Sequence, residues 1–456
     1  MKNLINRKLI AEYNRTRISE STDKICHAPF KSMYFAHYGR AVACCNNRTY
    51  GFGTYPEMTI KEIWFGEKAT QLRDYISNND LNLGCRDCKS HFQSRNFDAI
   101  KARMYDQLPL NENSYPSCME LELGNTCNLE CVMCSGEFSS AIRLNHDKKP
   151  LIKEPYDKKF IEQLEEFLPY LNELKFYGGE PFLIDIYYDI WDKIAEINPD
   201  IHIIVQTNGT VLNSRVKKVI EKGEFHITIS LDSLQKENYE KIRKNSKFED
   251  VIENIKYFHD YCKTKNTFFG ISVCAMKQNY HELPELISFC NKLDVPVYIH
   301  TIWFPLNCSL WNLASNDLAQ IFDYLSEFDF PAQNAIQEKN KIHYSDLLKQ
   351  VKQWHVNAIT RDKEKKNNLQ YKSTIDSFYT RIEHEVGKNH ELSCNGRKDR
   401  LKRIFKKIDK VFKLLPGDYP LESVLEILND KSMEYIVEDM ENNSVNELVE
   451  KLRQLG

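Results

Sequence analysis

Hydrophobic and polar positions alternate along the middle of the chain with the two periods that distinguish β-strands from α-helices. Six segments have the two-residue alternation or the short apolar run of a strand. The stretches between them, such as "FIEQLEEFLPYL" and "VIENIKYFHDYC", repeat apolar residues at helical spacing. This succession predicts an α/β fold with a parallel sheet or a partial barrel. The strand segments are residues 119–123, 173–179, 201–209, 225–233, 268–276 and 295–303.

The regions on either side have different patterns. Upstream, "SMYFAHYGRAVAC" indicates a β-hairpin that turns near Gly39, and "IKEIWFGEKATQLRDYI" has the periodicity of a helix. Downstream, helical spacing dominates, and a strongly basic amphipathic stretch at residues 397–413 precedes an acidic one at 421–443. A basic helix of this kind can contact a membrane, an acidic peptide or RNA. Pairing with the acidic segment is the simpler interpretation.

Three parts are therefore expected. Residues 1–112 would form a small cysteine-rich module, residues 113–310 the α/β domain, and residues 311–456 a mainly helical region. A chain of 456 residues is long enough for this organisation.

Charge and composition indicate which partners and which cellular compartment to expect. The net charge of −3 gives no general attraction to nucleic acid or to an anionic membrane, so no nucleic-acid partner is expected. The polar beginning lacks the apolar centre of a signal peptide, and no apolar run approaches the roughly 20 residues of a membrane span. We therefore expect a cytoplasmic protein. In such a reducing compartment its 14 cysteines are not expected to form disulfides.

Three cysteines lie within eight residues, directly after the first strand of the α/β domain. Thiolates are soft ligands that suit zinc, copper(I) and iron–sulfur clusters. Structural zinc and ordinary iron–sulfur clusters usually take four protein ligands, so a set of three leaves one metal position open for chemistry. A loop at a strand end is also the usual place for a site in α/β proteins. Spacing alone leaves a cysteine-rich turn or an incomplete zinc knuckle as alternatives. The three are Cys127, Cys131 and Cys134.

The Cys-x3-Cys-x2-Cys spacing resembles the signature of the radical S-adenosylmethionine (SAM) enzymes. The resemblance implies a partial (β/α)6 barrel, with the three thiolates holding a [4Fe–4S] cluster whose fourth iron binds SAM. The reduced cluster of these enzymes cleaves SAM to a 5′-deoxyadenosyl radical that takes a hydrogen atom from substrate. Met133 departs from the family, in which the residue before the third cysteine is commonly aromatic.

Motifs at the next strand ends strengthen the resemblance because they follow in the family's order. "GGEP" ends the second strand, and in the family this motif binds the methionyl amino group of SAM, which implies a role for Glu180. "QTNG" and "SLDS" end the third and fourth strands, where Ser230 would contact the ribose. "YEKIR" supplies Arg243 for the methionyl carboxylate. Ordinary strand-end polarity is the alternative for each motif alone. The implied SAM contacts are Gly178, Gly179, Glu180, Pro181, Thr207, Asn208, Ser230, Asp232 and Arg243.

The cysteines upstream of the barrel resemble a SPASM or twitch auxiliary-cluster module. Gly39-x4-Cys44 and Cys85-x2-Cys88 match its pattern, but Ser94 stands where the next cysteine of a two-cluster module is expected. The resemblance thus implies one auxiliary [4Fe–4S] cluster, in a module that precedes the barrel instead of following it. Structural zinc and unligated thiols are the alternatives. The candidate ligands are Cys26, Cys85, Cys88 and one of the adjacent Cys44 and Cys45, with Cys44 favoured by the glycine spacing.

The resemblance implies an enzyme whose substrate is a peptide or protein, a peptide maturase, since modules of this kind occur mostly in such enzymes. A radical SAM enzyme acting on a sugar, nucleoside or cofactor precursor is the alternative, and a non-catalytic iron–sulfur or zinc protein is a third. Expected partners are an external reductant such as flavodoxin or ferredoxin and a separate leader-peptide-binding protein. Cys308, just beyond the sixth strand, could return a hydrogen atom to substrate, although a buried loop cysteine is the simpler interpretation.

Overall fold

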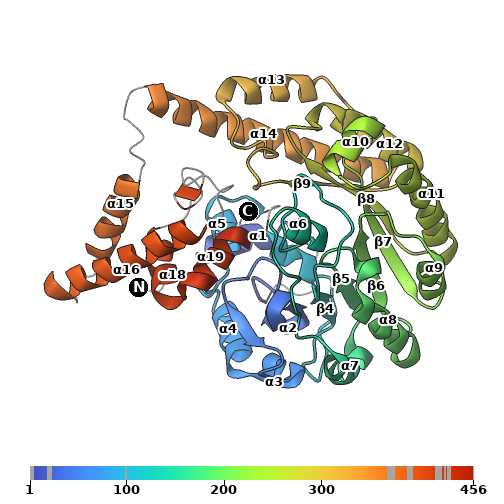
Figure 1. Cartoon of the computed structure of the whole chain (residues 1–456), viewed down its shortest axis with the longest axis horizontal. Coiled ribbons are helices and arrows are strands. Elements are labelled where there is room, and N and C mark those ends of the chain that lie inside the picture. Colours follow the sequence, from blue (N-terminus) through green and yellow to red (C-terminus); the bar gives the residue numbers. More distant parts are fainter. Residues whose placement is uncertain are drawn as a thin grey trace. The chain divides into compact units, whose positions relative to one another are not determined.

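A sheet of nine strands organises the described part of the chain, with the spatial order β3-β2-β1-β4-β5-β6-β7-β8-β9 (Figure 1). The computed structural model describes residues 5–17, 23–97, 100–366, 375–387, 394–415, 424–425, 428 and 433–454. The strands are β1 Ser32–Phe35, β2 Arg40–Val42, β3 Gly51–Thr54, β4 Cys118–Leu121, β5 Glu173–Phe176, β6 His202–Thr207, β7 Glu224–Ser230, β8 Phe269–Ala275 and β9 Val297–Thr301.

Strands β4 to β8 run parallel, and all six strands that the apolar pattern predicts are present. Strand β7 shows why the pattern worked, since Phe225, Ile227 and Ile229 are buried and alternate with more exposed residues. Helices connect the strands, as right-handed crossovers of parallel strands require. They are α6 Ser140–Asn145, α7 Lys158–Glu165, α8 Asp185–Ile197, α9 Ser214–Ile220, α10 Lys236–Ile242, α11 Phe248–Lys265 and α12 Leu283–Leu293.

Strand β4 departs from the prediction of a half-buried strand. All of its residues are buried, and the two glutamates that alternate with apolar residues, Glu120 and Glu122, are only 2% and 5% exposed. The cause is β1 of the amino-terminal module, which pairs with β4 in parallel so that Ser32 lies opposite Cys118. The module is thus part of the same sheet as the barrel strands, and its side chains cover the polar face of β4.

The module contains the predicted hairpin. Strands β1 and β2 are antiparallel, and Gly39 turns the chain with a φ of +78°. The single helix expected over residues 60–76 is in fact two, α3 Ile60–Phe65 and α4 Glu67–Ser77. Gly66 between them has an extended backbone, which ends the first helix and starts the second. The other module helices are α1 Arg7–Asn14, α2 Ala28–Lys31 and α5 Arg86–Gln93.

The chain divides into two compact units. The first comprises residues 1–273 and 290–298, and therefore holds the whole module together with strands β4 to β7; the second comprises residues 274–289 and 299–456. The expected domain boundaries at residues 112 and 310 stay predictions. Within the second unit α13 Ser315–Ser326 packs against α14 Ala335–Lys366, where the Tyr344 hydroxyl donates to the Leu325 carbonyl at 2.8 Å.

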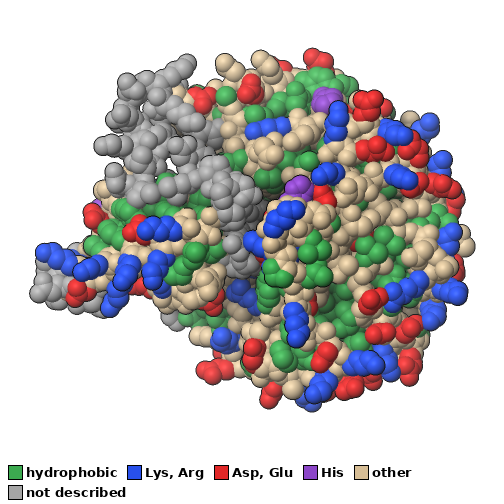
Figure 2. Space-filling model, in the orientation of Figure 1, with side chains coloured by type: hydrophobic (Ala, Val, Ile, Leu, Met, Phe, Trp, Pro, Cys, Tyr) green, Lys and Arg blue, Asp and Glu red, His purple; other side chains and the backbone are tan. Residues whose placement is uncertain are grey.

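The last helices of the second unit have a hydrophobic core of their own. α15 Ile375–Gly387, α16 Cys394–Leu414, α18 Met433–Asn442 and α19 Val445–Gln454 share it, with Ile382 and Ile408 fully buried. Figure 2 shows Lys and Arg side chains gathered along α16. Lys398, Lys402, Lys406 and Lys410 are exposed there at four-residue intervals. None of the helices in the described ranges is long and apolar enough to span a bilayer.

The predicted pairing of the basic helix with the acidic segment is present where that segment is described. Arg400 of α16 forms two hydrogen bonds to the Glu441 carboxylate of α18, at 2.6 and 2.7 Å. Residues 421–423, 426–427 and 429–432 of the acidic segment lie outside the described residues.

Candidate active site

The loop with three cysteines follows β4 and is held from two sides. On one side the Cys127 N–H donates to the Ser140 hydroxyl at 3.0 Å, and the Ser139 hydroxyl donates to the Leu129 carbonyl at 2.7 Å. On the other side, the Glu130 N–H donates to the Lys244 carbonyl at 3.0 Å and the Val132 N–H to the Ile242 carbonyl at 2.9 Å. These last two bonds flank Arg243, so the backbone itself brings this guanidinium to the cysteine loop.

The "GGEP" turn after β5 packs directly on the cysteine loop. Gly178 has a φ of +83°, and a Cβ there would lie 2.4 Å from the Gly124 carbonyl oxygen. A Cβ on Gly179 would lie 2.2 Å from the Thr126 carbonyl oxygen. The two glycines therefore permit an approach of backbone to backbone, which the Glu180 N–H completes by donating to Thr126 at 2.8 Å. The expected approach of this turn to a ligand stays a prediction.

The Glu180 carboxylate joins the ends of β5 and β6. It is fully buried and accepts from the Thr207 hydroxyl and the Asn208 N–H, each at 2.7 Å, and from the Phe182 N–H at 3.2 Å. Burial raises the pKa of Glu180 to about 7, although these hydrogen bonds oppose the rise. Pro181 begins the short 3-10 turn that follows. In this arrangement the carboxylate holds Thr207 and Asn208 in place.

Polar groups from β6, β7 and α10 converge on the cysteine loop. The Asn208 side-chain amide lies 4.0 Å from the Cys127 sulfur. Asp232, just beyond β7, is fully buried and pairs with Arg243 at 2.7 Å. Ser230 ends β7 and is partly exposed. The structure thus brings together the residues that the sequence motifs single out around the three thiols.

The thiols of the loop suit a metal cluster that is larger than a single ion. Burial raises the pKa of Cys131 to about 11 and also raises the pKa of Cys127 and Cys134, so positive iron would offset the cost of ionising them. Zinc–sulfur bonds of about 2.3 Å place the sulfurs of one zinc site roughly 3.8 Å apart. Among the described residues, the cysteines form no group of three or more whose sulfurs all lie within 4.8 Å of one another.

A second set of thiols lines a cavity in the amino-terminal module. As in the cysteine loop, the sulfurs are too far apart for one zinc ion. Apolar and aromatic side chains, including Phe92 and Tyr105, complete the wall. The four thiols are Cys26, Cys44, Cys85 and Cys88.

Cys45 is not among the residues that line this cavity. It packs instead with Tyr34, Val42 and Tyr177 on the side of the barrel strands. Both residues lie in the bend and turn that follow β2, where their side chains meet different surroundings. The geometry therefore favours Cys44 as the ligand, in line with the glycine spacing.

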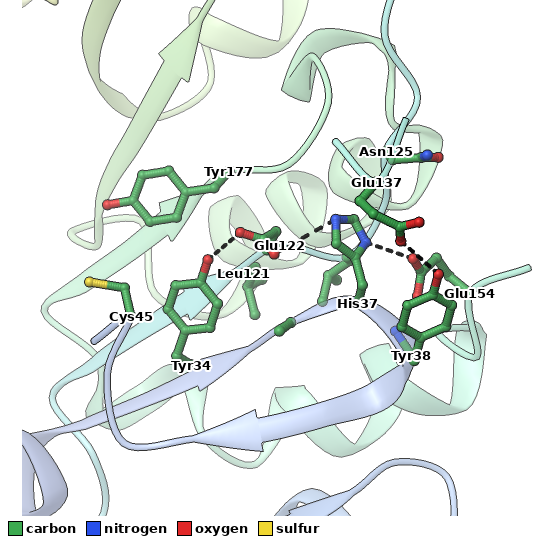
Figure 3. A network of polar contacts seen from close by, with 12 residues as sticks. Tyr34, His37, Tyr38, Cys45, Leu121, Glu122, Asn125, Glu137, Glu154 and Tyr177 are labelled. Carbon is green, nitrogen blue, oxygen red and sulfur yellow. Dashed lines mark hydrogen bonds and ion pairs between the residues drawn. The ribbon is translucent and has the colours of Figure 1, made fainter. Parts of the chain in front are cut away.

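A polar network that the sequence did not indicate joins the module to the barrel (Figure 3). Glu122, directly after β4, accepts from the Tyr34 hydroxyl at 2.5 Å and from both terminal nitrogens of Arg48, at 3.0 and 3.3 Å. Burial alone would raise the pKa of Glu122, but Arg48 and His37 outweigh it and lower the pKa. Two glutamates on one face of a strand were the only signal in the sequence, and they are also typical of a solvated face.

A cluster of two histidines and a glutamate lies at the amino-terminal ends of β6 and β7. The ligand atoms of His202, Glu224 and His226 lie within 4.8 Å of one another. However, the Phe268 N–H donates to Nδ1 of His226 at 3.1 Å, which leaves the proton of the neutral ring on Nε2. Neither ring nitrogen of His226 then offers a free lone pair. This cluster is not a metal site in the observed arrangement.

Cys308 belongs to the second unit and is fully buried. The Lys277 N–H donates to its carbonyl at 3.0 Å, and the Gln278 side-chain amide lies 3.5 Å from its sulfur. A thiol that returns a hydrogen atom has to reach substrate. The burial favours the simpler interpretation of a loop cysteine.

Comparison with known proteins identifies two domains. The Radical SAM superfamily model matches residues 121–290, and the model described as an iron–sulfur cluster-binding domain, SPASM, matches residues 26–89. A probable GTP 3′,8-cyclase of Methanocaldococcus jannaschii is 26% identical over 243 residues, which are 53% of this chain and 73% of that protein. A GTP 3′,8-cyclase of Clostridium perfringens is 24% identical over 38% of this chain and 51% of that protein. The chain spans about half the length of most curated relatives that it matches.

Solved structures show a weaker likeness. Native anSMEcpe with bound AdoMet matches with a TM-score of 0.35 and 18% identity, over 46% of this chain and 60% of that one. Streptococcus suis SuiB bound to the precursor peptide SuiA matches with a TM-score of 0.35 and 15% identity, over 58% and 52%. The fold assignment therefore rests on the parallel sheet itself and on the domain models.

The two domains define the cofactors. A radical SAM domain implies a [4Fe–4S] cluster and SAM, and a SPASM domain implies an auxiliary iron–sulfur cluster. The matched ranges contain all seven cysteines of the two sets and also Cys45. Residues 121–290 thus form a radical SAM domain, and residues 26–89, on its amino-terminal side, form a SPASM iron–sulfur cluster-binding domain.

Proposed function

We propose that this radical SAM enzyme abstracts a hydrogen atom from a peptide or protein and so acts as a peptide maturase. The observation that carries the proposal is the meeting of Cys127, Cys131 and Cys134 with Asn208 and Arg243 at one edge of the sheet. When bound, the cluster and SAM supply a 5′-deoxyadenosyl radical that removes the hydrogen atom.

Each group around the loop has a role in this proposal. The three thiolates bind the cluster, and Asp232 fixes the guanidinium of Arg243 so that it can hold the methionyl carboxylate of SAM. Ser230 at the end of β7 takes the ribose. Glu180 orders the strand ends through its three hydrogen bonds, and the methionyl amino group lies near Gly178–Pro181.

The choice of a peptide rests on the auxiliary module, which resembles those of peptide-modifying enzymes. A second candidate is a small molecule, and a specific observation favours it. The curated relatives named above are GTP 3′,8-cyclases, which makes a nucleotide the first small molecule to test. Their similarity covers 38 to 53% of this chain.

Partners follow from the chemistry. Each SAM that is cleaved consumes one electron, which an external reductant such as flavodoxin or ferredoxin would supply. A peptide substrate would be presented with the help of a separate leader-peptide-binding protein. We place the enzyme in the cytoplasm because iron–sulfur ligands need reduced thiols, and no disulfide joins the cysteines in the described part of the chain.

The first experiment tests the radical reaction. Anaerobic incubation of the reconstituted protein with SAM and a reductant should release 5′-deoxyadenosine, measured by chromatography and mass spectrometry. Replacing Cys127, Cys131 and Cys134 by alanine should abolish this product while the circular dichroism spectrum stays that of a folded protein. If the triple variant still makes 5′-deoxyadenosine, the assigned cluster site is wrong.

The second experiment separates the two substrate classes. The enzyme is incubated under the same conditions with GTP, and separately with short peptides encoded beside its gene. A change in peptide mass, together with deuterium from a labelled peptide in the 5′-deoxyadenosine, would support the maturase. Conversion of GTP to a cyclised product with no peptide change would replace it by the nucleotide enzyme.

A further inference from the structure

The turn of the auxiliary module lies beside the loop that carries the radical-site cysteines. Strands β1 and β4 are parallel neighbours in register, so they end at the same edge of the sheet. The chain leaves β4 into the cysteine loop and leaves β1 into the turn at His37 and Tyr38. The carboxyl-terminal edge of a parallel sheet is where α/β enzymes place functional residues.

The turn has an unusual backbone. Tyr38 has a φ of +60°, which is uncommon for a bulky residue, and Gly39 follows with a φ of +78°. Two successive left-handed residues direct the Tyr38 N–H to Glu154, to which it donates at 2.7 Å. Strain of this kind persists only where surrounding contacts hold it, and it often marks functional segments. The contacts of His37 and Tyr38 therefore indicate the role of this turn.

His37 is buried between two carboxylates. It is 7% exposed, its Nδ1 lies 2.7 Å from Glu154, and its Nε2 lies 3.7 Å from Glu122 (Figure 3). Its Nε2 is buried and has no hydrogen-bond partner. The ring also packs at a tilt against Phe138, with centroids 5.8 Å apart. Phe138 lies four residues beyond Cys134, so His37 touches the end of the cysteine loop.

Tyr38 makes the second contact with that loop. Its hydroxyl donates to the Glu137 carboxylate at 2.9 Å, and Arg143 pairs with the same carboxylate at 2.9 Å. Glu137 is three residues beyond Cys134. The bonds to Ser139 and Ser140 and to the carbonyls of Ile242 and Lys244 hold the beginning and middle of the cysteine loop. The module turn holds its end.

The same turn is linked to the auxiliary site by a short strand. Strand β2 begins directly after Gly39 and ends at Val42, two residues before Cys44. Cys44 lines the auxiliary cavity. Metal binding at four thiols contributes to the folding of a small domain, so a loaded module should hold this hairpin more rigidly than an empty one.

We propose that His37 and Tyr38 are positioning residues through which the auxiliary module sets the geometry of the radical-site loop. The module then acts on the radical site by direct contact, in addition to any role of its own cluster. SAM binding by the barrel cluster would consequently depend on an intact turn. The proposal rests on the proposed function, since it concerns the same cluster and SAM.

The test compares tyrosine variants within the module. Tyr38→Phe removes the hydroxyl that donates to Glu137 and keeps the ring and the backbone, and Tyr38 is 44% exposed, so the core is undisturbed. Tyr55→Phe is the matched control, because its hydroxyl donates to Asp157 at 2.7 Å and not to the cysteine loop. The readouts are iron content and the change in the electron paramagnetic resonance spectrum of the reduced cluster as SAM is added.

We expect Tyr38→Phe to keep its auxiliary iron and its fold but to bind SAM about tenfold more weakly, the loss typical of one charge-assisted hydrogen bond. Tyr55→Phe should bind SAM like the wild type. Tyr38→Phe, Glu137→Gln and the double variant form a thermodynamic cycle. The double variant should bind SAM no more weakly than the single variant with the lower affinity. Additive losses, or wild-type SAM binding by Tyr38→Phe, would overturn the proposal.

His37 adds a dependence on pH. Burial and the positive charge of Arg48 both act to lower the pKa of His37. The carboxylates of Glu154 and Glu122 outweigh them and raise this pKa above its ordinary 6.5. The stabilisation that the charged form contributes is then fully present below the ordinary pKa of 6.5 and is lost as the pH rises through the raised value. SAM affinity should fall over that range in the wild type and stay level in His37→Asn, which keeps a donor for Glu154.

These outcomes are distinct from failure of the proposed function. If the wild-type protein shows no spectral change with SAM, the proposed function fails and the turn is not involved. If the wild type responds and His37→Asn has the same pH profile and affinity as the wild type, the positioning role is wrong.

Discussion

Single residues decide which thiols face which site. Cys44 and Cys45 are neighbours in sequence, yet one lines the auxiliary cavity and the other packs against Tyr34 and Tyr177. Both lie in the bend and turn just beyond β2, so strand register does not decide between them. The sequence could favour Cys44 only through its distance from Gly39. The structure adds the physical reason, which is that this turn places Cys44 at the cavity and Cys45 beside Tyr34 and Tyr177.

The adjacent cysteines form a matched pair for experiment. We expect Cys44→Ala to lower the reconstituted iron from about eight to about four per chain, because only the barrel cluster would remain. Cys45→Ala should keep about eight. Iron analysis of the two variants gives the answer, and loss of auxiliary iron in Cys45→Ala alone would reverse the assignment.

Glu180 provides a prediction about pH. Its pKa is raised to about 7 from an ordinary 4.5, so its contribution to stability is complete below about pH 4.5 and is lost as the pH rises through 7. The shift of roughly 2.5 units corresponds to about 3 kcal/mol. Glu180→Gln cannot ionise, so its stability relative to the wild type should improve by about that amount between about pH 4.5 and 8. Thermal denaturation of both proteins at several pH values measures the difference, and parallel curves would contradict it.

At the scale of elements, the strand pattern was predictable and the pairing across the module was not. Alternation or a short apolar run located all six barrel strands. The same pattern presented Glu120 and Glu122 as a solvated face of β4, although both are buried. Which element covers a polar face depends on a partner distant in sequence, here β1, and local periodicity carries no information about it. The motifs GGEP, QTNG and SLDS were found because each lies within a few residues of a strand end, whereas Arg243 of YEKIR follows α10.

A substitution that displaces the turn after β5 should also disrupt the cysteine loop after β4. In Gly179→Ala the new Cβ would meet backbone that cannot move without shifting Cys127, so we expect loss of barrel iron and a lower melting temperature. Gly387→Ala is the control, since a Cβ there meets nothing within 4 Å. If Gly179→Ala takes up barrel iron as well as Gly387→Ala does, the close approach is not required.

At the scale of the whole molecule, the carboxyl-terminal helices should be separable. α15, α16, α18 and α19 enclose a core of their own, with Ile382, Ile408 and Val411 fully buried. A fragment of residues 375–456 should therefore be helical by circular dichroism and melt cooperatively. The chain ending at residue 366 should still take up about eight irons. A fragment without a cooperative transition would show that this core depends on the rest of the chain.

The pairing of β1 with β4 also has a consequence for biosynthesis. The ribosome makes Ser32 86 residues before Cys118, the residue opposite it, which corresponds to roughly 4 to 17 s at about 5–20 residues per second. All four auxiliary thiols emerge in that interval or shortly before it. Cys118 belongs to the apolar cluster against which Cys26 and Cys44 pack, so the arrival of β4 completes the packing behind these two thiols. Iron delivered during translation would thus meet an open auxiliary site before the radical-site loop exists, and the order of synthesis favours filling the auxiliary site first.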